Sequence, residues 1–181
     1  MKVKVLLACV LTIALSGSAF AQKLAYINSQ KILATYKEAQ DAQEQLDKIN
    51  KAWEEEGREM QKQFQDLGEQ LESQSLLLSE ERQKEKQQEL QSLYMKIQQY
   101  QQEKWGQSGE FYKKQDELMQ PIIDKINTAI KKIGEEERFD FIFDTVAGNI
   151  LYASPGQTDL TDLVLQELEK GLESTSKTPQ R

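Results

Sequence analysis

Carboxylates are the only side chains in this sequence that are numerous and clustered enough to suggest acid–base chemistry. The 181-residue chain has 30 Asp and Glu residues, with consecutive runs at Glu54–Glu56 and Glu135–Glu137, and it has no histidine. Two carboxyl groups can act as general acid and general base when their surroundings separate their pKa values. Histidine-dependent catalysis and the usual zinc sites lack their residues. The enzyme class left to weigh is a hydrolase that uses carboxylates alone.

The carboxylate runs are nevertheless typical of solvated helix faces. Neither run lies in a predicted pocket with a neighbour that would shift its pKa. Most of the chain belongs to the helical segments described below, which leaves no domain large enough to form a cleft. We therefore predict that the protein is not an enzyme, and that it has no catalytic, cofactor-binding or metal-binding residue.

The first 21 residues have the pattern of a signal peptide. Lys2 and Lys4 provide a basic start, residues 5–15 are apolar, and Ala-Phe-Ala at residues 19–21 is a small-x-small cleavage signal. The apolar run is shorter than the roughly 20 residues that span a bilayer as a helix. We expect the mature chain to begin at Gln22, to lie in the periplasm and to have no stable membrane insertion.

Lipid attachment at Cys9 is an alternative, because the Leu-Leu-Ala-Cys sequence at residues 6–9 resembles a lipoprotein box. A lipidated cysteine would end the apolar run, whereas here the run continues and residues 10–21 would have no role. Cleavage after Ala21 removes the only cysteine. The mature protein then cannot form a disulfide, so its stability has to come from packing and assembly.

The charge balance argues against nucleic acid as a partner. Without Lys2 and Lys4, 21 of the 23 basic residues remain against 30 acidic ones, which gives the mature chain a net charge of −9. Contacts to phosphates need clustered Lys and Arg, and anionic membrane surfaces attract the same residues. We expect neither among the partners.

Residues 38–119 have the heptad pattern of a coiled-coil hairpin, which we call the arm. Apolar residues recur in steps of three and four along its outbound half. The pattern lacks the expected apolar residue at Glu56 and again near Gln74. Ser79 followed by two glutamates predicts a helix N-cap after a tip near residues 73–79. The outbound seam consists of Ala39, Ala42, Leu46, Ile49, Trp53, Met60, Phe64, Leu67, Leu71 and Leu78.

The returning half repeats the pattern, so the two seams can pack against each other. A fold-back centred near residue 76 places Trp53 level with Tyr100. A centre near residue 79 places Trp53 level with Trp105, and Phe64 level with Tyr94. The sequence leaves both open. The returning seam consists of Leu90, Leu93, Ile97, Tyr100, Lys104 or Trp105, Phe111, Gln115, Leu118, Ile122, Ile126, Ala129 and Ile133.

Glycines and one proline interrupt these helices. Each glycine costs about 1 kcal/mol relative to alanine in a helix interior, so it either makes room for large seam residues or softens the arm so that it bends. Proline should kink the helix or begin a new one, and we expect an offset near residue 120. The hinge candidates are Gly57, Gly68, Gly106, Gly109 and Pro121.

The two ends of the mature chain predict a small β-rich body formed by residues 22–37 and 120–173. Strands are expected at residues 23–28, 138–144 and 150–153, with a turn at 147–149. Ser-Pro-Gly at 154–156 ends the last strand. Asp159 or Thr161 then caps a final amphipathic helix, and residues 174–181 are expected to be disordered.

This body is too small to be stable alone. A three-stranded sheet leaves two unpaired edges and exposes much of its aromatic face. Closing the sheets of several chains into one barrel would satisfy the edges and bury the aromatic side chains together. The fold class predicted is therefore α+β and predominantly α, with a small β-barrel body formed by oligomerisation and long helical arms. The residues expected in the shared body are Leu24, Tyr26, Phe139, Phe141, Phe143, Ile150 and Tyr152.

Five segments occur in the order seen in the Skp/OmpH family of outer-membrane-protein chaperones, which this chain resembles over essentially its whole mature length. Besides the signal peptide and the long hairpin, they are KLAYIN at residues 23–28, QPIIDKI at 120–126, FDFIFD at 139–144 and DLTD at 159–162. The end segments are the specific part of the resemblance. The arms match only in length and periodicity.

The resemblance implies a homotrimer with a β-barrel body and three arms that enclose a cavity. It further implies that the cavity holds unfolded outer-membrane β-barrel proteins in the periplasm without ATP or any cofactor. The best-known members are strongly basic, whereas this chain is acidic. A structural spacer or tether without a client is the alternative from another class.

Apolar side chains on the arm are possible client contacts. Leucines at the tip and two tyrosines beside the seam could bind unfolded chains, or they could serve only to close the turn and pack the helices. These possible client contacts are Leu76, Leu77, Leu78, Tyr94 and Tyr112.

Overall fold

The computed structural model describes residues 22–146, 148 and 150–176. The predicted signal peptide, the end of the predicted tail from residue 177, and two of the three residues of the predicted turn at 147–149 lie outside this part. The elements in chain order are β1 (Leu24–Ile27), α2 (Ser29–Thr35), α3 (Lys37–Gln74), α4 (Glu80–Trp105), α5 (Glu110–Glu137), β2 (Phe141–Asp144), β3 (Thr158–Asp159) and α6 (Thr161–Ser176).

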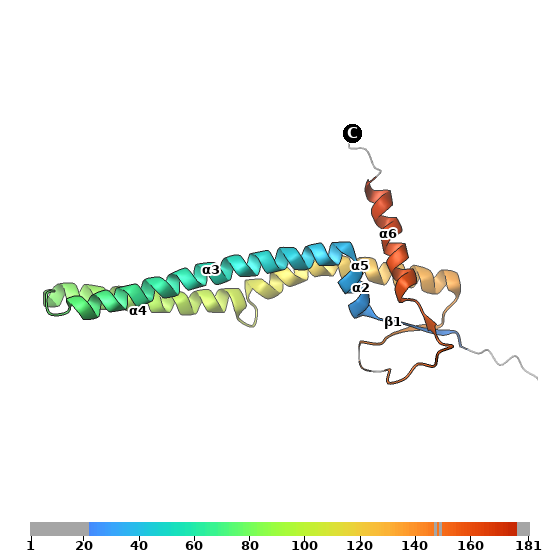
Figure 1. Ribbon diagram of the computed structural model, residues 1–181, viewed down its shortest axis with the longest axis horizontal. Coiled ribbons are helices and arrows are strands. Elements are labelled where there is room, and N and C mark those ends of the chain that lie inside the picture. Colours follow the sequence, from blue (N-terminus) through green and yellow to red (C-terminus); the bar gives the residue numbers. More distant parts are fainter. Residues whose placement is uncertain (1–21, 147, 149, 177–181) are drawn as a thin grey trace, which may run out of the picture.

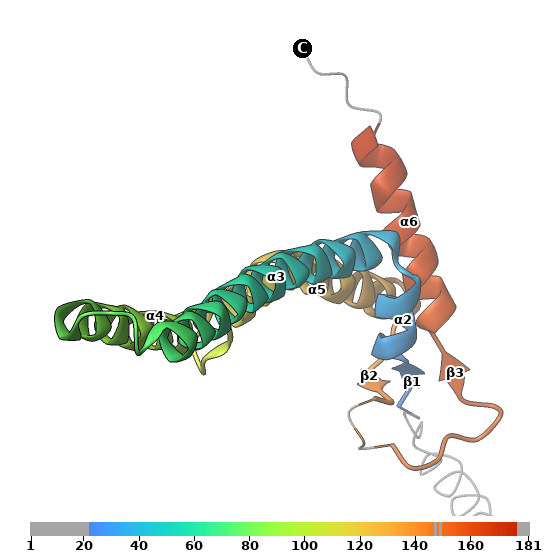
Figure 2. The same cartoon turned by 60° about the vertical axis from the view of Figure 1, so that its left-hand side comes forward.

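The chain forms a long helical arm that projects from a small base. Helix α3 runs outward, α4 returns beside its distal half and α5 beside its proximal half (Figure 1). The base contains α2, α6 and the three strands (Figure 2). The predicted helical hairpin and small sheet are confirmed, whereas the single chain does not test whether sheets close into a barrel.

The heptad seam is the reason that α3 and its partners form helices. All the residues of the outbound seam, from Ala39 to Leu78, are buried or half-buried, while the intervening charged and amide residues are exposed, except for the half-buried Asn50. The turn lies between Gln74 and Glu80, and the Ser79 side chain caps α4 by accepting a hydrogen bond from the Arg82 N–H. The seam therefore holds the hairpin together along its length.

The base has a core within one chain. The ends of α3 and α5 nearest the base contribute to it together with β1, α2 and α6. Its buried residues are Ala25, Ile27, Ile32, Tyr36, Ala39, Ala42, Ile122, Ile126, Ala129, Ile133, Leu160, Val164, Leu165 and Leu168. Helix α2, which the sequence analysis did not predict, enters this core through Ile32 and is capped by the Asn28 side chain.

The sheet is parallel and has the strand order β2-β1-β3. The predicted strand at residues 150–153 is wrong, because this segment forms no strand and bends at Leu151. Its place beside β1 is taken by Thr158–Asp159. The reason lies in α6: Thr161 Oγ1 accepts a hydrogen bond from the Asn28 N–H at 2.9 Å, and the Leu160 N–H donates to the Tyr26 carbonyl at 2.8 Å. The start of α6 thus fixes which residues reach the sheet.

The offset expected near residue 120 is also misplaced. The returning helix breaks between Trp105 and Glu110, and Pro121 lies inside α5 with its ring exposed. The break needs glycine. A Cβ on Gly106 would lie 2.3 Å from the Gln102 carbonyl oxygen, and one on Gly109 would lie 2.6 Å from the Lys104 carbonyl oxygen. Close approach of backbone atoms, and not proline, therefore sets the position of the break.

Candidate functional surfaces

The middle of the arm is fastened by an aromatic cluster formed by Trp53, Tyr100 and Trp105. The indole rings of Trp53 and Trp105 meet edge-to-face at 6.5 Å between centroids, and Tyr100 meets Trp105 at 6.1 Å. Further along the arm, Phe64 packs against Tyr94 at 6.1 Å. Both cross-helix pairs are symmetric about residue 79, so the later of the two predicted fold-back centres is the one adopted.

The polar atoms of this cluster have partners. The Tyr100 hydroxyl donates to Glu56 at 2.8 Å and also lies 3.2 Å from the Trp53 carbonyl oxygen. Partial burial, together with the adjacent Glu56 carboxylate, raises the pKa of Tyr100. The Trp105 indole N–H donates to Asn50 Oδ1 at 2.8 Å. These contacts fix the rings in one arrangement.

Lys104 connects the cluster across the helix break. Its ammonium group lies 4.8 Å from the Trp53 ring centroid and 5.5 Å from that of Tyr100, and it pairs with the Glu110 carboxylate at 2.5 Å. Cation–π contacts strengthen when the cation is partly desolvated, as this one is. The first residue of α5 is thereby tied to the end of α4.

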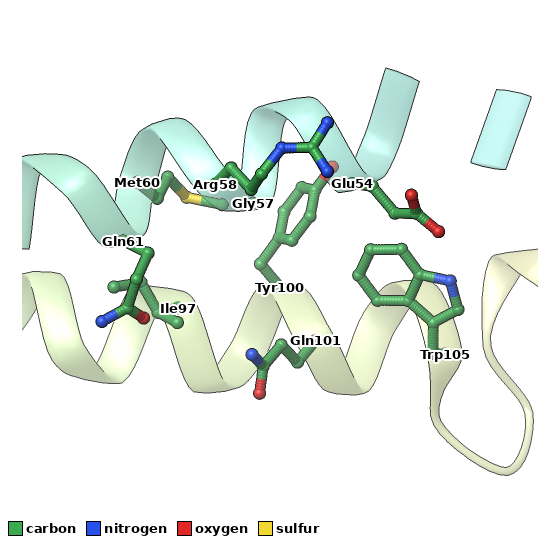
Figure 3. A pocket seen from close by; sticks show the side chains of 9 residues that line it. All are labelled: Glu54, Gly57, Arg58, Met60, Gln61, Ile97, Tyr100, Gln101 and Trp105. Atoms are coloured by element: carbon green, nitrogen blue, oxygen red, sulfur yellow. The ribbon is translucent and has the colours of Figure 1, made fainter. Parts of the chain in front are cut away.

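A groove of about 310 Å³ opens beside this cluster, between α3 and α4. Figure 3 shows its walls: Tyr100 and Trp105 come from α4, whereas Met60 and the backbone of Gly57 come from α3. Gly57 is half-buried and Glu56 is exposed. The heptad position that lacks an apolar side chain is therefore Gly57, one residue later than predicted. The remaining lining residues are Glu54, Arg58, Gln61, Ile97 and Gln101.

The tip of the arm presents apolar side chains to solvent. Leu76 is 97% exposed and Leu77 is 85% exposed, whereas Leu78 is half-buried and closes the seam. Tyr94 and Tyr112 are each about half exposed, and each meets an aromatic neighbour: Phe64 at 6.1 Å between ring centroids for Tyr94, and Phe111 at 5.7 Å for Tyr112. Of the five predicted contact residues, four leave substantial apolar surface uncovered in the single chain.

The sheet has two different faces. Ala25, Ile27 and Ile142 point into the base core. On the opposite face, Leu24 is paired with Phe141 and Tyr26 with Phe143. Paired residues of adjacent strands share a face, so four of the seven residues predicted for a shared body form one continuous surface, on which the rings of Phe141 and Phe143 stack at 6.1 Å.

The other three residues predicted for the shared body lie elsewhere. Phe139 precedes β2 and packs against the base core, with the Lys23 ammonium 4.0 Å from its ring centroid. Ile150 is half-buried and Tyr152 is exposed, and both are on the segment that does not pair. The structure therefore does not bring these three onto the outer sheet face.

A second groove, of about 500 Å³, lies in the base between α3, α5 and α6. Ion pairs cross it, from Lys125 to Glu38 at 2.6 Å and from Lys132 to Glu167. Burial, reinforced by the nearby Glu38 carboxylate, raises the pKa of Tyr36 to about 12. Four of the charged groups that line this groove are thus paired with one another, and the fifth, Asp124, accepts a hydrogen bond from the Gln120 side chain at 2.9 Å.

Asp144 links β2 to the start of α2. Its carboxylate accepts hydrogen bonds from the Ser29 hydroxyl at 2.6 Å, from the Ser29 N–H at 3.2 Å and from the Val146 N–H at 3.0 Å. Partial burial favours the neutral acid, but these hydrogen bonds outweigh it and lower the pKa of Asp144. This carboxylate has a structural role.

Neither metal binding nor a membrane span is indicated in the described residues. Residues 22–146, 148 and 150–176 contain no group of three or more Asp, Glu, Cys or His side chains placed to hold a metal ion. Over the same part of the chain, no helix combines the length and the apolar character needed to cross a bilayer.

Comparison with known proteins identifies the family. The model of the family described as outer membrane protein (OmpH-like) matches residues 23–168. The chain belongs to the OmpH-like family. The resemblance noted from the end segments is thereby confirmed. A search of curated proteins returned no match.

A solved structure supports the fold of this OmpH-like chain. It is the crystal structure of a candidate outer membrane chaperone (OmpH-like) from Caulobacter crescentus, with a TM-score of 0.70 and 14% sequence identity over 83% of this chain and 86% of that one. At this identity the likeness concerns the fold alone.

Two features of the surfaces escaped the sequence analysis. The groove at Gly57 was hidden because the heptad pattern alone does not say which of residues 56 and 57 faces the partner helix. The cluster around Lys104 was hidden because its contact to Glu110 crosses a helix break that was not predicted. The sequence did contain one signal for the groove, since Gly57 lies four residues after Trp53, at seam spacing.

Proposed function

We propose that this OmpH-like chain is an ATP-independent holding chaperone of the periplasm. It binds unfolded outer-membrane β-barrel proteins and prevents their aggregation before they insert into the membrane. The single observation that carries the proposal is that the arm uses its heptad seam internally and still exposes apolar side chains at its tip, with Leu76 97% exposed and Leu77 85% exposed. A spacer has no need of such residues.

Holding without ATP is physically reasonable on such a surface. Many weak contacts can retain a client that keeps its own disorder, since the entropy lost at each contact is small and the contacts act together. The partly exposed tyrosines and the tip leucines are spread along the arm, from Tyr112 near its middle to Leu77 at its end. A client segment can therefore exchange between contacts without leaving the arm.

The proposed working form is a homotrimer. The outer face of the sheet, with Leu24, Tyr26, Phe141 and Phe143, supplies apolar surface that the single chain leaves uncovered. Among the residues that the structure describes, strands β2 and β3 each leave one edge without a partner strand. Sheets of three chains closed into one barrel would pair these edges and cover this face.

Flexibility of the arm is part of the proposal. A Cβ on Gly68 would meet nothing within 4 Å, and one on Gly57 would meet only the Tyr100 ring, at 3.8 Å. Neither glycine of α3 is therefore required to make room for a neighbour. Each lowers the local stability of the helix by about 1 kcal/mol relative to alanine, which favours bending of the arm around clients of different size.

The test is suppression of aggregation by the purified mature protein. An outer-membrane β-barrel protein unfolded in urea is diluted into buffer, and light scattering is followed with increasing amounts of the chaperone and without nucleotide. We expect scattering to fall to the baseline at about one trimer per client. Unchanged scattering at every ratio would contradict the proposal and favour the spacer or tether.

The tip is tested with Leu76→Ser/Leu77→Ser against Leu78→Ser. The first variant removes exposed apolar surface, so it should weaken suppression of scattering several-fold while the thermal unfolding of the arm stays unchanged. The second removes a half-buried seam residue and should lower the unfolding temperature. Equal suppression by the double variant and the wild type would show that the tip does not contact the client.

A further inference from the structure

We propose that the groove at Gly57 is a binding subsite for one aromatic side chain that is flanked by basic residues in an unfolded client. The inference rests on the proposed holding function and names the part of the client that the middle of the arm recognises. Its basis is a seam position without a side chain, next to a wall of aromatic rings and in an acidic stretch of helix.

The groove is an interruption of the seam and is not needed for packing. At Gly57 the heptad pattern calls for an apolar residue, and the neighbouring seam residues Met60 and Ile97 are buried. A Cβ at Gly57 would lie 3.8 Å from Tyr100 Cε1, an ordinary van der Waals distance. A side chain is therefore compatible with this position. The open space beside the Gly57 backbone belongs to the groove of about 310 Å³.

Gly68 shows that the groove is specific to one site. It is also a half-buried glycine inside α3, but a Cβ there would meet no atom within 4 Å, and Gly68 lines neither groove. Of the two glycines, only Gly57 lies beside side chains that a bound group could contact. The two glycines therefore form a matched pair for experiments.

The walls favour an aromatic occupant. The rings of Tyr100 and Trp105 and the thioether of Met60 border the groove (Figure 3). A third ring can meet these edges and faces in the tilted and edge-to-face arrangements that aromatic groups prefer, and sulfur–aromatic contacts are also favourable. The volume is at the lower end of the roughly 300–1,000 Å³ found for small-molecule pockets, which suits a single side chain. Outer-membrane barrels carry girdles of aromatic residues.

The charges around the groove favour basic neighbours in the client. The charged residues that line the groove are Glu54 and Arg58, and Arg58 already pairs with Glu55 at 3.1 Å. Glu55 and Glu56 follow Glu54 in sequence and add two further carboxylates nearby. Lys104 is paired with Glu110 across the helix break. The excess carboxylates attract cationic residues on either side of the bound ring.

The first experiment uses short peptides and the protein's own fluorescence. Both tryptophans of the chain, Trp53 and Trp105, belong to the cluster at the groove. The probe is the tryptophan-free peptide acetyl-Ser-Lys-Phe-Lys-Ser-amide, and the controls replace its Phe by Ala or both of its Lys by Glu. We expect a saturable change in emission with the probe and at least a tenfold weaker response with either control. Equal responses to all three peptides would overturn the proposal.

The second experiment fills the groove. Gly57→Leu completes the seam, so the proposal predicts an unusual combination: a higher urea midpoint, together with at least a tenfold loss of peptide affinity and several-fold weaker suppression of client scattering. Gly68→Leu adds the same side chain to the same helix, and it should raise the midpoint without affecting binding. Gly57→Ala, whose Cβ fits at 3.8 Å, should give a smaller loss of affinity and covers the case in which leucine disturbs the hairpin.

The outcomes separate this subsite from the holding function. If the wild type suppresses aggregation and both Gly57 variants bind peptide and client as well as it does, the subsite is excluded and the holding function stands. If the wild type does not suppress aggregation at all, the proposed function fails first. Loss of binding in Gly68→Leu as well would point to a general effect of stiffening α3 and would also overturn the subsite.

Discussion

The indole of Trp105 lies edge-on to the indole of Trp53, with ring centroids 6.5 Å apart and ring planes at 86°. The two residues are 52 positions apart in sequence and meet because the hairpin folds back about residue 79. Their arrangement joins the end of α4 to the middle of α3 immediately before the helix break. The cluster thus stabilises the arm where its backbone is least continuous.

The hydrogen bond from the Trp105 indole to Asn50 should contribute measurably to the stability of the arm. Trp105→Phe keeps an aromatic ring but removes the donor, and Asn50→Ala removes the acceptor. In a double-mutant cycle the two changes should couple by about 0.5–1.5 kcal/mol, measured by urea unfolding followed by circular dichroism. Asn50→Ala combined with the distant Phe64→Leu is the control and should be additive. Additivity in the first pair would show that this bond contributes nothing.

Replacing the glycines of the arm by alanine should stabilise the protein at one position and destabilise it at two others. Gly68→Ala should stabilise α3 by up to about 1 kcal/mol, because an interior helix position gains a better helix former and the new methyl group meets open space. Gly106→Ala and Gly109→Ala should each destabilise the arm by more than about 1 kcal/mol, because their Cβ atoms would overlap backbone carbonyls. Urea midpoints measure all three. Stabilisation by Gly106→Ala would mean that the helix break can close into a continuous helix.

Alanine substitutions at adjacent residues of β2 should have different effects, on the oligomeric state for one face of the sheet and on the stability of the single chain for the other. Phe141 is 53% exposed on the outer sheet face and Phe143 is 44% exposed on the same face, whereas Ile142 packs against the core. Phe141→Ala/Phe143→Ala should lower the mass measured by light scattering from that of a trimer toward that of one chain. Ile142→Ala should keep the trimer mass but lower the free energy of unfolding by about 1–3 kcal/mol. An unchanged mass for the double variant would exclude this face from the assembly.

Asp144 should make the base sensitive to acid. Because its hydrogen bonds lower its pKa in the folded state, the unfolded chain binds more protons at low pH and stability rises with pH. The contribution of Asp144 is complete above the unfolded pKa of about 3.9 and is lost as the pH falls through the lower folded value. The difference in unfolding free energy between wild type and Asp144→Asn should therefore be constant from about pH 7 to pH 5 and shrink toward pH 3. If this difference in unfolding free energy stayed constant over the whole pH range, Asp144 would not be a source of the acid sensitivity.

The arm was predictable because its pattern is long and local. Helical periodicity repeats over many turns, so the seam from Ala39 to Leu78 and the cap at Ser79 could be read directly. The pairing of Phe64 with Tyr94 was one of two alternatives, because a shift of a few residues in the tip changes every partner. Packing of aromatic rings across the helices selects between them.

The base was less predictable because its partners are far apart in sequence. The segment at 150–153 has strand-forming residues, yet Thr158–Asp159 pairs with β1, since the hydrogen bonds of Leu160 and Thr161 to the first strand and its end fix the chain there. The break at Gly106 was assigned to Pro121 for a related reason. Proline has a known local effect, whereas the glycine requirement comes from carbonyl oxygens that approach only in the folded chain.

By itself, the sequence determined the helical hairpin, the position of its turn to within a few residues, the absence of histidine and the acidic charge, since composition and period are properties of the chain alone. Tertiary structure decided which face of the sheet is covered, where the returning helix breaks, and that the missed seam position is Gly57 and opens a groove. These features depend on which atoms meet across long separations. Local preference does not specify such contacts, because each is selected by packing against a partner that folding brings into place.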